Sequence, residues 1–266
     1  MTIRKLISSV IITVLFPLIA FSQKDKKGTV KDTREYVDLG LPSGTLWATC
    51  NIGASKPEEC GLYFAWGETE GYKQDSDDIH QWEKKSYKWY DCNSKYPELL
   101  KYRCCSWNAI IDNKEELDPE DDAATVNWGR KWQMPSSEQI KELCDSAYTT
   151  KEWTTLNGVN GRKITSKKNG HSIFLPAAGV LPGSTGDYWS CSLSGDDDSK
   201  AISLSFLEND YFFDDYIPRY YGLNIRPVRS QKNRKEAKPE ITDDGATVMP
   251  IEDDQLIIIQ SEPDEK

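Results

Sequence analysis

Histidine is scarce in this sequence, with two among 266 residues. Histidine is the commonest general base, so few acid–base mechanisms that depend on it remain open. The patterns HExxH, CxxC and GxSxG and the glycine-rich nucleotide-binding loops are also missing, which disfavours a zinc site, a metalloprotease and a nucleotide-dependent enzyme. A carboxylate-dependent hydrolase stays open, because 43 acidic residues always supply some pair. Glycosidases, however, need two carboxyl groups at a defined separation, and no spacing in the sequence indicates one.

A concentrated basic surface is also lacking. Lysine and arginine number 33 against 43 aspartates and glutamates, and the formal net charge is −10. The one basic cluster, residues 232–238, lies in the tail and is followed by Asp243 and Asp244. Binding a polyanion such as DNA requires clustered positive charge, so nucleic acid is not expected as a partner.

Long hydrophobic runs are absent apart from residues 6–20. Arg4 and Lys5 precede this run, and small residues at Ala20 and Ser22 precede Gln23. The run is shorter than the roughly 20 apolar residues that a membrane-spanning helix needs. We therefore predict a cleavable signal peptide at 1–22, no transmembrane anchor after cleavage, and an exported product that is periplasmic, cell-surface or extracellular.

The remaining composition predicts one domain between polar ends. Residues 23–34 form a polar linker, residues 35–230 can bury an ordinary core, and residues 231–266 are interpreted as a disordered charged tail. Within the tail, residues 256–259 are apolar. They either dock on the domain as an added strand or have no role.

Seven cysteines in a chain expected to be exported predict disulfides, because oxidising compartments allow them to persist. The odd count leaves at least one thiol unpaired or paired with another chain. The pairing itself cannot be deduced from the sequence.

Two capped helices are predicted near the middle of the chain. Asp118 suits an N-cap, Pro119 the first helical position and Gly129 the exit, which predicts a helix over 119–128. Ser136 and Gln139 have the spacing of a capping box at the start of a second helix. Its apolar face recurs at helical spacing through Ile140, Leu143, Cys144 and Ala147.

Several phrases of the chain resemble one known family. They are YVDLGLPSGTLWATCNIGASKPEECGLYFAWGET at 36–69, PEDDAATVNWGRKWQMPSSEQ at 119–139, NGHSIFLPAAG at 169–179 and YGLNIRPVR at 221–229. Together they resemble the Fibrobacter succinogenes major paralogous domain family, which is related to the formylglycine-generating-enzyme-like branch of the C-type lectin fold. The resemblance implies an α+β, C-type lectin-like fold with two short helices packed on twisted antiparallel sheets.

Antiparallel strands are predicted on both sides of the helices. Residues 36–41 and 45–48 flank the turn residues Pro42, Ser43 and Gly44. Asn169 and Gly170 lie between two apolar-containing runs, 161–165 and 172–175, which is a strong hairpin signal. Residues 202–207 and 223–227 alternate in polarity. The resemblance implies that the closing strand returns beside the first.

The functional hypothesis concerns residues 208–221, ENDYFFDDYIPRYY, which combine acidic and aromatic side chains. The resemblance places this connection on an exposed binding face. Tyrosine is a favoured recognition residue, and carboxylates beside aromatic rings suit sugar hydroxyls or basic peptide patches. The alternative is that alternate aromatic residues are core and the acids are solvated. The predicted ligand-binding residues are Asn209, Asp210, Tyr211, Asp214, Asp215, Tyr216, Arg219 and Tyr220.

Formylglycine generation and calcium binding are the two chemical possibilities that the resemblance raises. The first requires a reactive cysteine pair late in the domain, whereas Cys191 is the only cysteine after Cys144. No acidic cluster matches an EF-hand loop. No metal ligand or other cofactor is therefore assigned, and calcium is left open with Asp214 and Asp215 as the pair of interest.

We therefore predict a non-catalytic ligand-binding module whose target is a glycan or a protein. The alternative is a structural or adhesion component of a cell-surface assembly, in which residues 256–259 contact a partner. The sequence does not identify the ligand or the oligomeric state.

Overall fold

The structure, a computed structural model, describes residues 33–73, 83–93, 95, 98–104, 111–179, 181–214, 217–230, 240–241, 247–250 and 256–259. The chain divides into two compact units, residues 34–238 and a second unit formed by residues 1–33 and 239–266. Each unit is described by itself.

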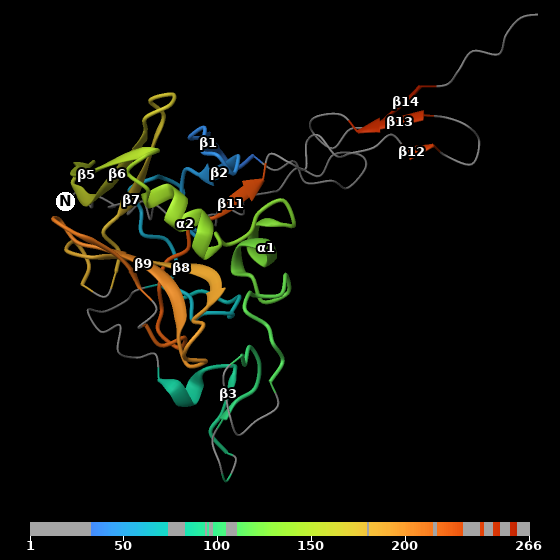
Figure 1. Ribbon diagram of the computed structural model, residues 1–266, viewed down its shortest axis with the longest axis vertical. Coiled ribbons are helices and arrows are strands. Elements are labelled where there is room, and N and C mark those ends of the chain that lie inside the picture. The colour runs from blue at the N-terminus through green and yellow to red at the C-terminus, as the bar shows by residue number, and fades with distance from the viewer. Residues whose placement is uncertain are drawn as a thin grey trace, which may run out of the picture. The chain divides into compact units, whose positions relative to one another are not determined.

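The larger unit is α+β, with short helices between antiparallel strands (Figure 1). Its helices are η2 (Lys84–Ser86), α1 (Ala123–Trp128) and α2 (Ser137–Cys144). Its strands are β1 (Tyr36–Asp38), β2 (Thr45–Ala48), β3 (Tyr90–Asp91), β4 (Glu98–Leu99), β5 (Thr149–Leu156), β6 (Val159–Ser166), β7 (Ser172–Pro176), β8 (Gly186–Leu193), β9 (Ala201–Phe206), β10 (Tyr211–Asp214) and β11 (Val228–Ser230).

These strands form three three-stranded sheets and one pair, with the orders β1-β2-β11, β5-β6-β7, β10-β9-β8 and β3-β4. The closing strand β11 returns to the first sheet, where it pairs with β2 and not with β1. Every residue of β8 is buried. One edge of β8 pairs with β9, and single bridges from Glu116 and Asn224 cover parts of the other edge.

The first predicted helix is shorter than expected. Asp122, and not Asp118, is the N-cap, and its carboxylate accepts hydrogen bonds from Thr125 N and from the distant Met134 N, both at 2.8 Å. Residues 119–121 therefore form a turn before the helix, although Gly129 ends it as predicted, with a φ of 92°. The hydrogen bond from Met134 N explains why α1 begins after Asp122, because it ties the Asp122 carboxylate to the chain that follows the helix.

The second helix begins as the sequence predicts. Ser136 and Gln139 form the reciprocal capping box, and Ile140, Leu143 and Cys144 are buried. Ala147 lies beyond the end of α2 and is exposed. The buried face of α2 packs on β8, β9 and β5.

Two successive hairpins build the β5-β6-β7 sheet. The predicted one joins β6 to β7, and Gly170 takes a φ of 76° in its turn. Sequence analysis did not assign the other, in which β5 and β6 pair over eight residues each across Asn157 and Gly158. Both turn residues have positive φ, 49° and 86°, which is the geometry that an Asn-Gly type I′ turn requires.

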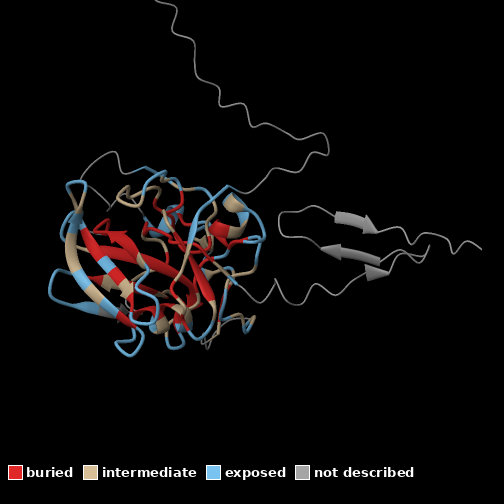
Figure 2. Ribbon diagram, turned by 90° about the horizontal axis from the view of Figure 1, so that it is seen from above, coloured by how far each residue is buried: buried red, intermediate tan, exposed pale blue. Residues whose placement is uncertain are grey.

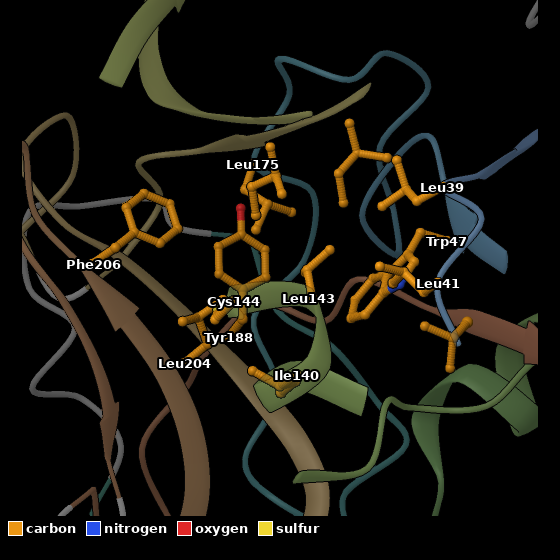
Figure 3. Packing of buried hydrophobic residues seen from close by; sticks show 13 residues of the cluster. Leu39, Leu41, Trp47, Ile140, Leu143, Cys144, Leu175, Tyr188, Leu204 and Phe206 are labelled. Atoms are coloured by element: carbon orange, nitrogen blue, oxygen red, sulfur yellow. The ribbon is translucent and has the colours of Figure 1, made fainter. Parts of the chain in front are cut away.

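Buried apolar side chains form two clusters inside the larger unit. The buried residues are red in Figure 2 and lie mainly along the inner strands of this unit. Cluster 1 lies between α2 and the sheets and is mostly aliphatic, with Trp47, Tyr188 and Phe206 as its large rings (Figure 3). Cluster 2 is richer in aromatic residues and includes Trp66 and Tyr102.

The predicted disulfides are absent from the residues that the structure describes. None of the six described cysteines is disulfide-bonded to another of them: Cys50, Cys60, Cys92, Cys104, Cys144 and Cys191. Cys144 belongs to cluster 1 and Cys191 to cluster 2, so the two buried thiols pack as small apolar side chains in separate cores. The seventh cysteine, Cys105, lies outside the described residues.

The C-terminal tail was expected to be disordered, but its described residues form a small antiparallel sheet. The sheet consists of β12 (Glu240–Ile241), β13 (Thr247–Pro250) and β14 (Leu256–Ile259), in the order β12-β13-β14. The apolar run at 256–259 thus pairs with β13. The predicted signal peptide and nearly all of the linker lie outside the described residues.

Candidate ligand-binding site

The structure divides the predicted binding segment between the two ends of β9. At one end, Tyr211 pairs with Phe206 in the β9–β10 hairpin. At the other end, Pro218 forms a bridge with Lys200, just before β9 begins. Six strand residues separate these points, which corresponds to about 20 Å. The predicted residues therefore do not form one continuous surface.

The hairpin end presents Asn209, Asp210 and Tyr211, all exposed. Buried Arg162 of β6 holds this turn, because its Nη2 donates to the carbonyl oxygens of Leu207, Glu208 and Asp210. The ring of Tyr211 lies 4.7 Å from the ammonium group of Lys151. We call this region the hairpin tip.

Arg219 differs from its expected placement on an exposed face, since none of its surface is exposed. Tyr220 is half-buried. Asp214 lies on β10, and nothing is described of its side chain, while Asp215 and Tyr216 lie outside the described residues. From the sequence alone, an arginine in an acidic, aromatic stretch is expected on the surface. Only the packing around Arg219 shows that it is buried.

The guanidinium of Arg219 forms four hydrogen bonds with interior acceptors. Its Nε donates to the hydroxyl of Tyr87 at 3.1 Å, and Nη2 donates to Lys101 O at 3.1 Å. Nη1 donates to Tyr102 O at 3.1 Å and to Asp198 O at 2.8 Å. The guanidinium carbon also lies 4.8 Å from the ring centroid of Trp66. These contacts join the segments around residues 87, 101 and 198 to the end of β9.

A pocket lies at this end of β9 and encloses about 440 Å³ of space open to solvent. Its walls combine the rings of Tyr87 and Tyr220, the apolar side chains Leu99 and Pro218, and polar or charged residues. The lining residues are Lys84, Tyr87, Leu99, Ser199, Pro218, Arg219 and Tyr220. Small-molecule sites are mostly apolar with a few polar groups, and this lining has the same mixed character.

Two polar groups lie at the pocket wall in different environments. Lys84 is exposed, and its Nζ lies 4.4 Å from the ring centroid of Tyr90. The hydroxyl of Ser199 donates to Asp197 at 2.6 Å, and Asp197 forms an ion pair with Lys200 at 3.0 Å. Ser199 therefore offers an oxygen lone pair to a ligand.

Backbone strain lies directly beside the pocket. Tyr102, which is fully buried, has a φ of 62°, in the left-handed region that bulky residues rarely adopt. Hydrogen bonds from Tyr102 N to Asp112 (2.7 Å) and from Arg219 to Tyr102 O hold this conformation. Strained residues of this kind concentrate at functional sites, where the surrounding structure compensates for their cost.

A network of charges adjoins the strained residue. The hydroxyl of Tyr102 donates to Asp121 at 2.7 Å, and Lys101 forms ion pairs with Asp118 and Asp121 at 2.5 and 2.6 Å. Hydrogen bonds from Lys101 and Lys114 lower the pKa of Asp118 below its usual range. Burial raises the pKa of Tyr87, so its hydroxyl stays protonated and donates to Trp66 O at 2.6 Å.

The described residues contain no group of three or more His, Cys, Asp or Glu side chains that could hold a metal ion. Asp118 and Asp121, which belong to one of the acidic clusters of the sequence, form ion pairs with lysines. The calcium hypothesis for Asp214 and Asp215 concerns side chains outside the described part of the chain.

Sequence analysis missed the residues that complete the pocket. Lys84, Leu99 and Ser199 come from three segments that are far apart in the chain. None of them belongs to a motif, so only the tertiary structure brings them to Tyr220.

No family model, curated protein or solved structure matches this chain. The resemblance described above therefore remains an expectation. Within the described residues, no helix is long and apolar enough to cross a membrane.

Proposed function

We propose that this protein is an exported, non-catalytic module that binds a ligand, a glycan or a protein, through the pocket at the Tyr220 end of β9. The observation that carries the proposal is the pocket itself, which is lined by two tyrosines together with polar groups from separate segments. Such walls suit recognition, because tyrosine offers a rigid apolar face with a polar tip. The strained Tyr102 beside it adds an independent reason to place function here.

Binding without chemistry fits the character of the pocket lining. The described lining residues include no histidine, cysteine or carboxylate, which are the commonest groups in general acid–base and covalent catalysis. Export follows from the predicted signal peptide at 1–22.

A glycan array with the purified chain tests this proposal. Tyr220→Ala removes a wall of the pocket, and we expect loss of at least about tenfold in affinity, since stacking on an aromatic ring contributes on the order of 1 kcal/mol or more. Tyr211→Ala is the matched control, because this tyrosine lies at the hairpin tip, at the other end of β9. Binding that depends on Tyr211 and not on Tyr220 would assign the ligand to the hairpin tip.

The second candidate is a structural or adhesion component of a cell-surface assembly. The observation that favours it is the small tail sheet, in which β14 lies at an edge and exposes backbone groups able to pair with another strand. In that case the array shows no binding, and the full chain enters a surface assembly. Ile258→Pro should abolish assembly, because proline cannot donate a backbone hydrogen bond in a strand.

A further inference from the structure

The two charged residues that line the pocket, Lys84 and Arg219, are both cations, and neither forms an ion pair within the described part of the chain. The Nζ of Lys84 lies 4.4 Å from the ring centroid of Tyr90. The guanidinium of Arg219 is fully buried and donates to three carbonyl oxygens and one phenol. Its hydrogen bonds are satisfied, but none of these acceptors carries a neutralising charge.

The other cations near the pocket differ in this respect. Lys85, next to Lys84 on η2, is paired with Glu83, and Lys200 is paired with Asp197. Lys101 forms ion pairs with Asp118 and Asp121. The carboxylate of Asp198 accepts from Cys104 N at 2.8 Å. Among the described lining residues, the charged groups are therefore the two cations Lys84 and Arg219, in a chain whose formal net charge is −10.

We propose that the ligand of this pocket is an acidic sugar. The pocket recognises a pyranose ring that bears a carboxylate, as in a uronic acid. The inference rests on the proposed function and names its ligand class. The carboxylate is placed at Lys84, within the positive potential to which buried Arg219 contributes. The electrostatic attraction between a ligand carboxylate and these cations is stronger here than on an open surface, because apolar walls reduce the screening by water.

The walls favour a sugar over an acidic peptide. Tyr220, Leu99 and Pro218 line the pocket, as does the largely buried Tyr87, and their apolar surface suits the C–H face of a pyranose ring. The oxygen of Ser199 is available as an acceptor for a sugar hydroxyl, since its own proton is donated to Asp197. An acidic peptide brings carboxylates on flexible side chains and no ring for these walls.

Calorimetric titration of the full chain with trigalacturonic acid and with its methyl ester tests the inference. The ester keeps the ring and removes the charge, so we expect it to bind at least about tenfold more weakly than the acid, the usual size of a charge-assisted hydrogen bond. Added salt should weaken binding of the acid and leave binding of the ester unchanged.

Variants at one turn of η2 provide the matched comparison. Lys84→Met should lower affinity for the acid about tenfold without changing affinity for the ester, and Lys84→Glu should abolish binding of the acid. Lys85→Met is the control, since Lys85 is paired with Glu83 and does not line the pocket. Both lysines are exposed, so the variants should fold with unchanged thermal unfolding curves.

The outcomes separate this inference from the proposed function. Equal affinity for acid and ester, with both lost in Tyr220→Ala, would overturn the acidic ligand and keep a glycan-binding pocket. Tighter binding of penta-glutamate than of trigalacturonic acid would overturn it in favour of an acidic peptide. Failure of trigalacturonic acid to bind at all would also overturn it, and failure of every sugar on the array would remove the glycan reading of the proposed function.

Discussion

Each end of β9 is organised by one buried arginine, Arg162 at the hairpin tip and Arg219 at the pocket. Both donate to backbone carbonyl oxygens from other segments. Arg162 uses only Nη2 for its hydrogen bonds, and its Nε is buried without a partner in the described structure. Arg219 uses all three nitrogens, and its guanidinium lies near the rings of Trp66, Tyr87 and Tyr102.

The difference shows how a charge can be buried without a carboxylate. At the hairpin tip, the carbonyl oxygens belong to exposed residues that water can reach if the arginine is removed. At the pocket, three of the four acceptors belong to the buried residues Tyr87, Tyr102 and Asp198, where water has little access if the arginine is removed. We therefore expect the hairpin tip to tolerate change and the pocket to depend on its arginine.

The largest effect is expected from Arg219→Met. The change leaves three carbonyl oxygens and the Tyr87 hydroxyl without their donor, at about 1–3 kcal/mol for each group that water cannot reach. We expect a loss of about 3 kcal/mol in the free energy of unfolding, measured by urea denaturation. A loss below about 1 kcal/mol would show that water entering from the pocket replaces the guanidinium.

A smaller effect is expected from Arg162→Met. The exposed turn can hydrate its carbonyl oxygens, and methionine removes a buried Nε that has no partner in the described structure. The free energy of unfolding should fall by about 1 kcal/mol in the same urea assay. Hydrogen exchange should increase at Asp210 and Tyr211. If this variant is destabilised as strongly as Arg219→Met, the contrast between the two ends is wrong.

Tyr87→Phe tests the contribution of the Tyr87 hydroxyl to the surroundings of Arg219. It removes the hydroxyl that accepts from Arg219 and donates to Trp66 O, and it keeps the ring. The expected loss is about 1 kcal/mol, measured by thermal unfolding. Tyr90→Phe is the control, because the Tyr90 ring contacts Lys84 and does not line the pocket. A control loss as large as that of Tyr87→Phe would contradict the role given to the Tyr87 hydroxyl.

The smallest effect should appear as a pH dependence in Lys101→Met. Hydrogen bonds from Lys101 and Lys114 lower the pKa of Asp118, so the folded state binds fewer protons there than the unfolded state. This contribution is present above the ordinary carboxyl value of 3.8 and is lost as the pH falls through the lower folded pKa. The stability gap between the wild type and Lys101→Met should therefore be widest near neutral pH and close below about pH 3. Urea denaturation of both proteins at a series of pH values from about 2.5 to about 7 measures this gap. A gap that stays constant over that range would contradict the role given to Lys101.

Local signals predicted those elements that short-range interactions define. The capping box of Ser136 and Gln139 and the turn at Gly170 depend on neighbours in sequence, and both were found. The start of α1 was wrong because Met134 N, twelve residues away, binds the carboxylate of Asp122. The Asn157-Gly158 pair is a type I′ hairpin signal in the sequence, but no hairpin was predicted there.

Composition singled out residues 208–221 as a candidate binding segment, but it did not predict how these residues are placed. An acidic and aromatic stretch indicates recognition, yet it cannot show that Tyr211 and Tyr220 lie at opposite ends of β9. The pairing of Tyr211 with Phe206 and the bridge of Pro218 to Lys200 set that separation.

The sequence by itself determined the α+β class, the second helix and a strand pattern, because capping, turn conformation and polarity alternation act over a few residues. Only the tertiary structure decided that Arg219 is buried and that Lys84, Leu99 and Ser199 meet at Tyr220. The physical reason is that a guanidinium becomes an interior residue only when distant carbonyl oxygens converge on it, and no local pattern encodes that convergence.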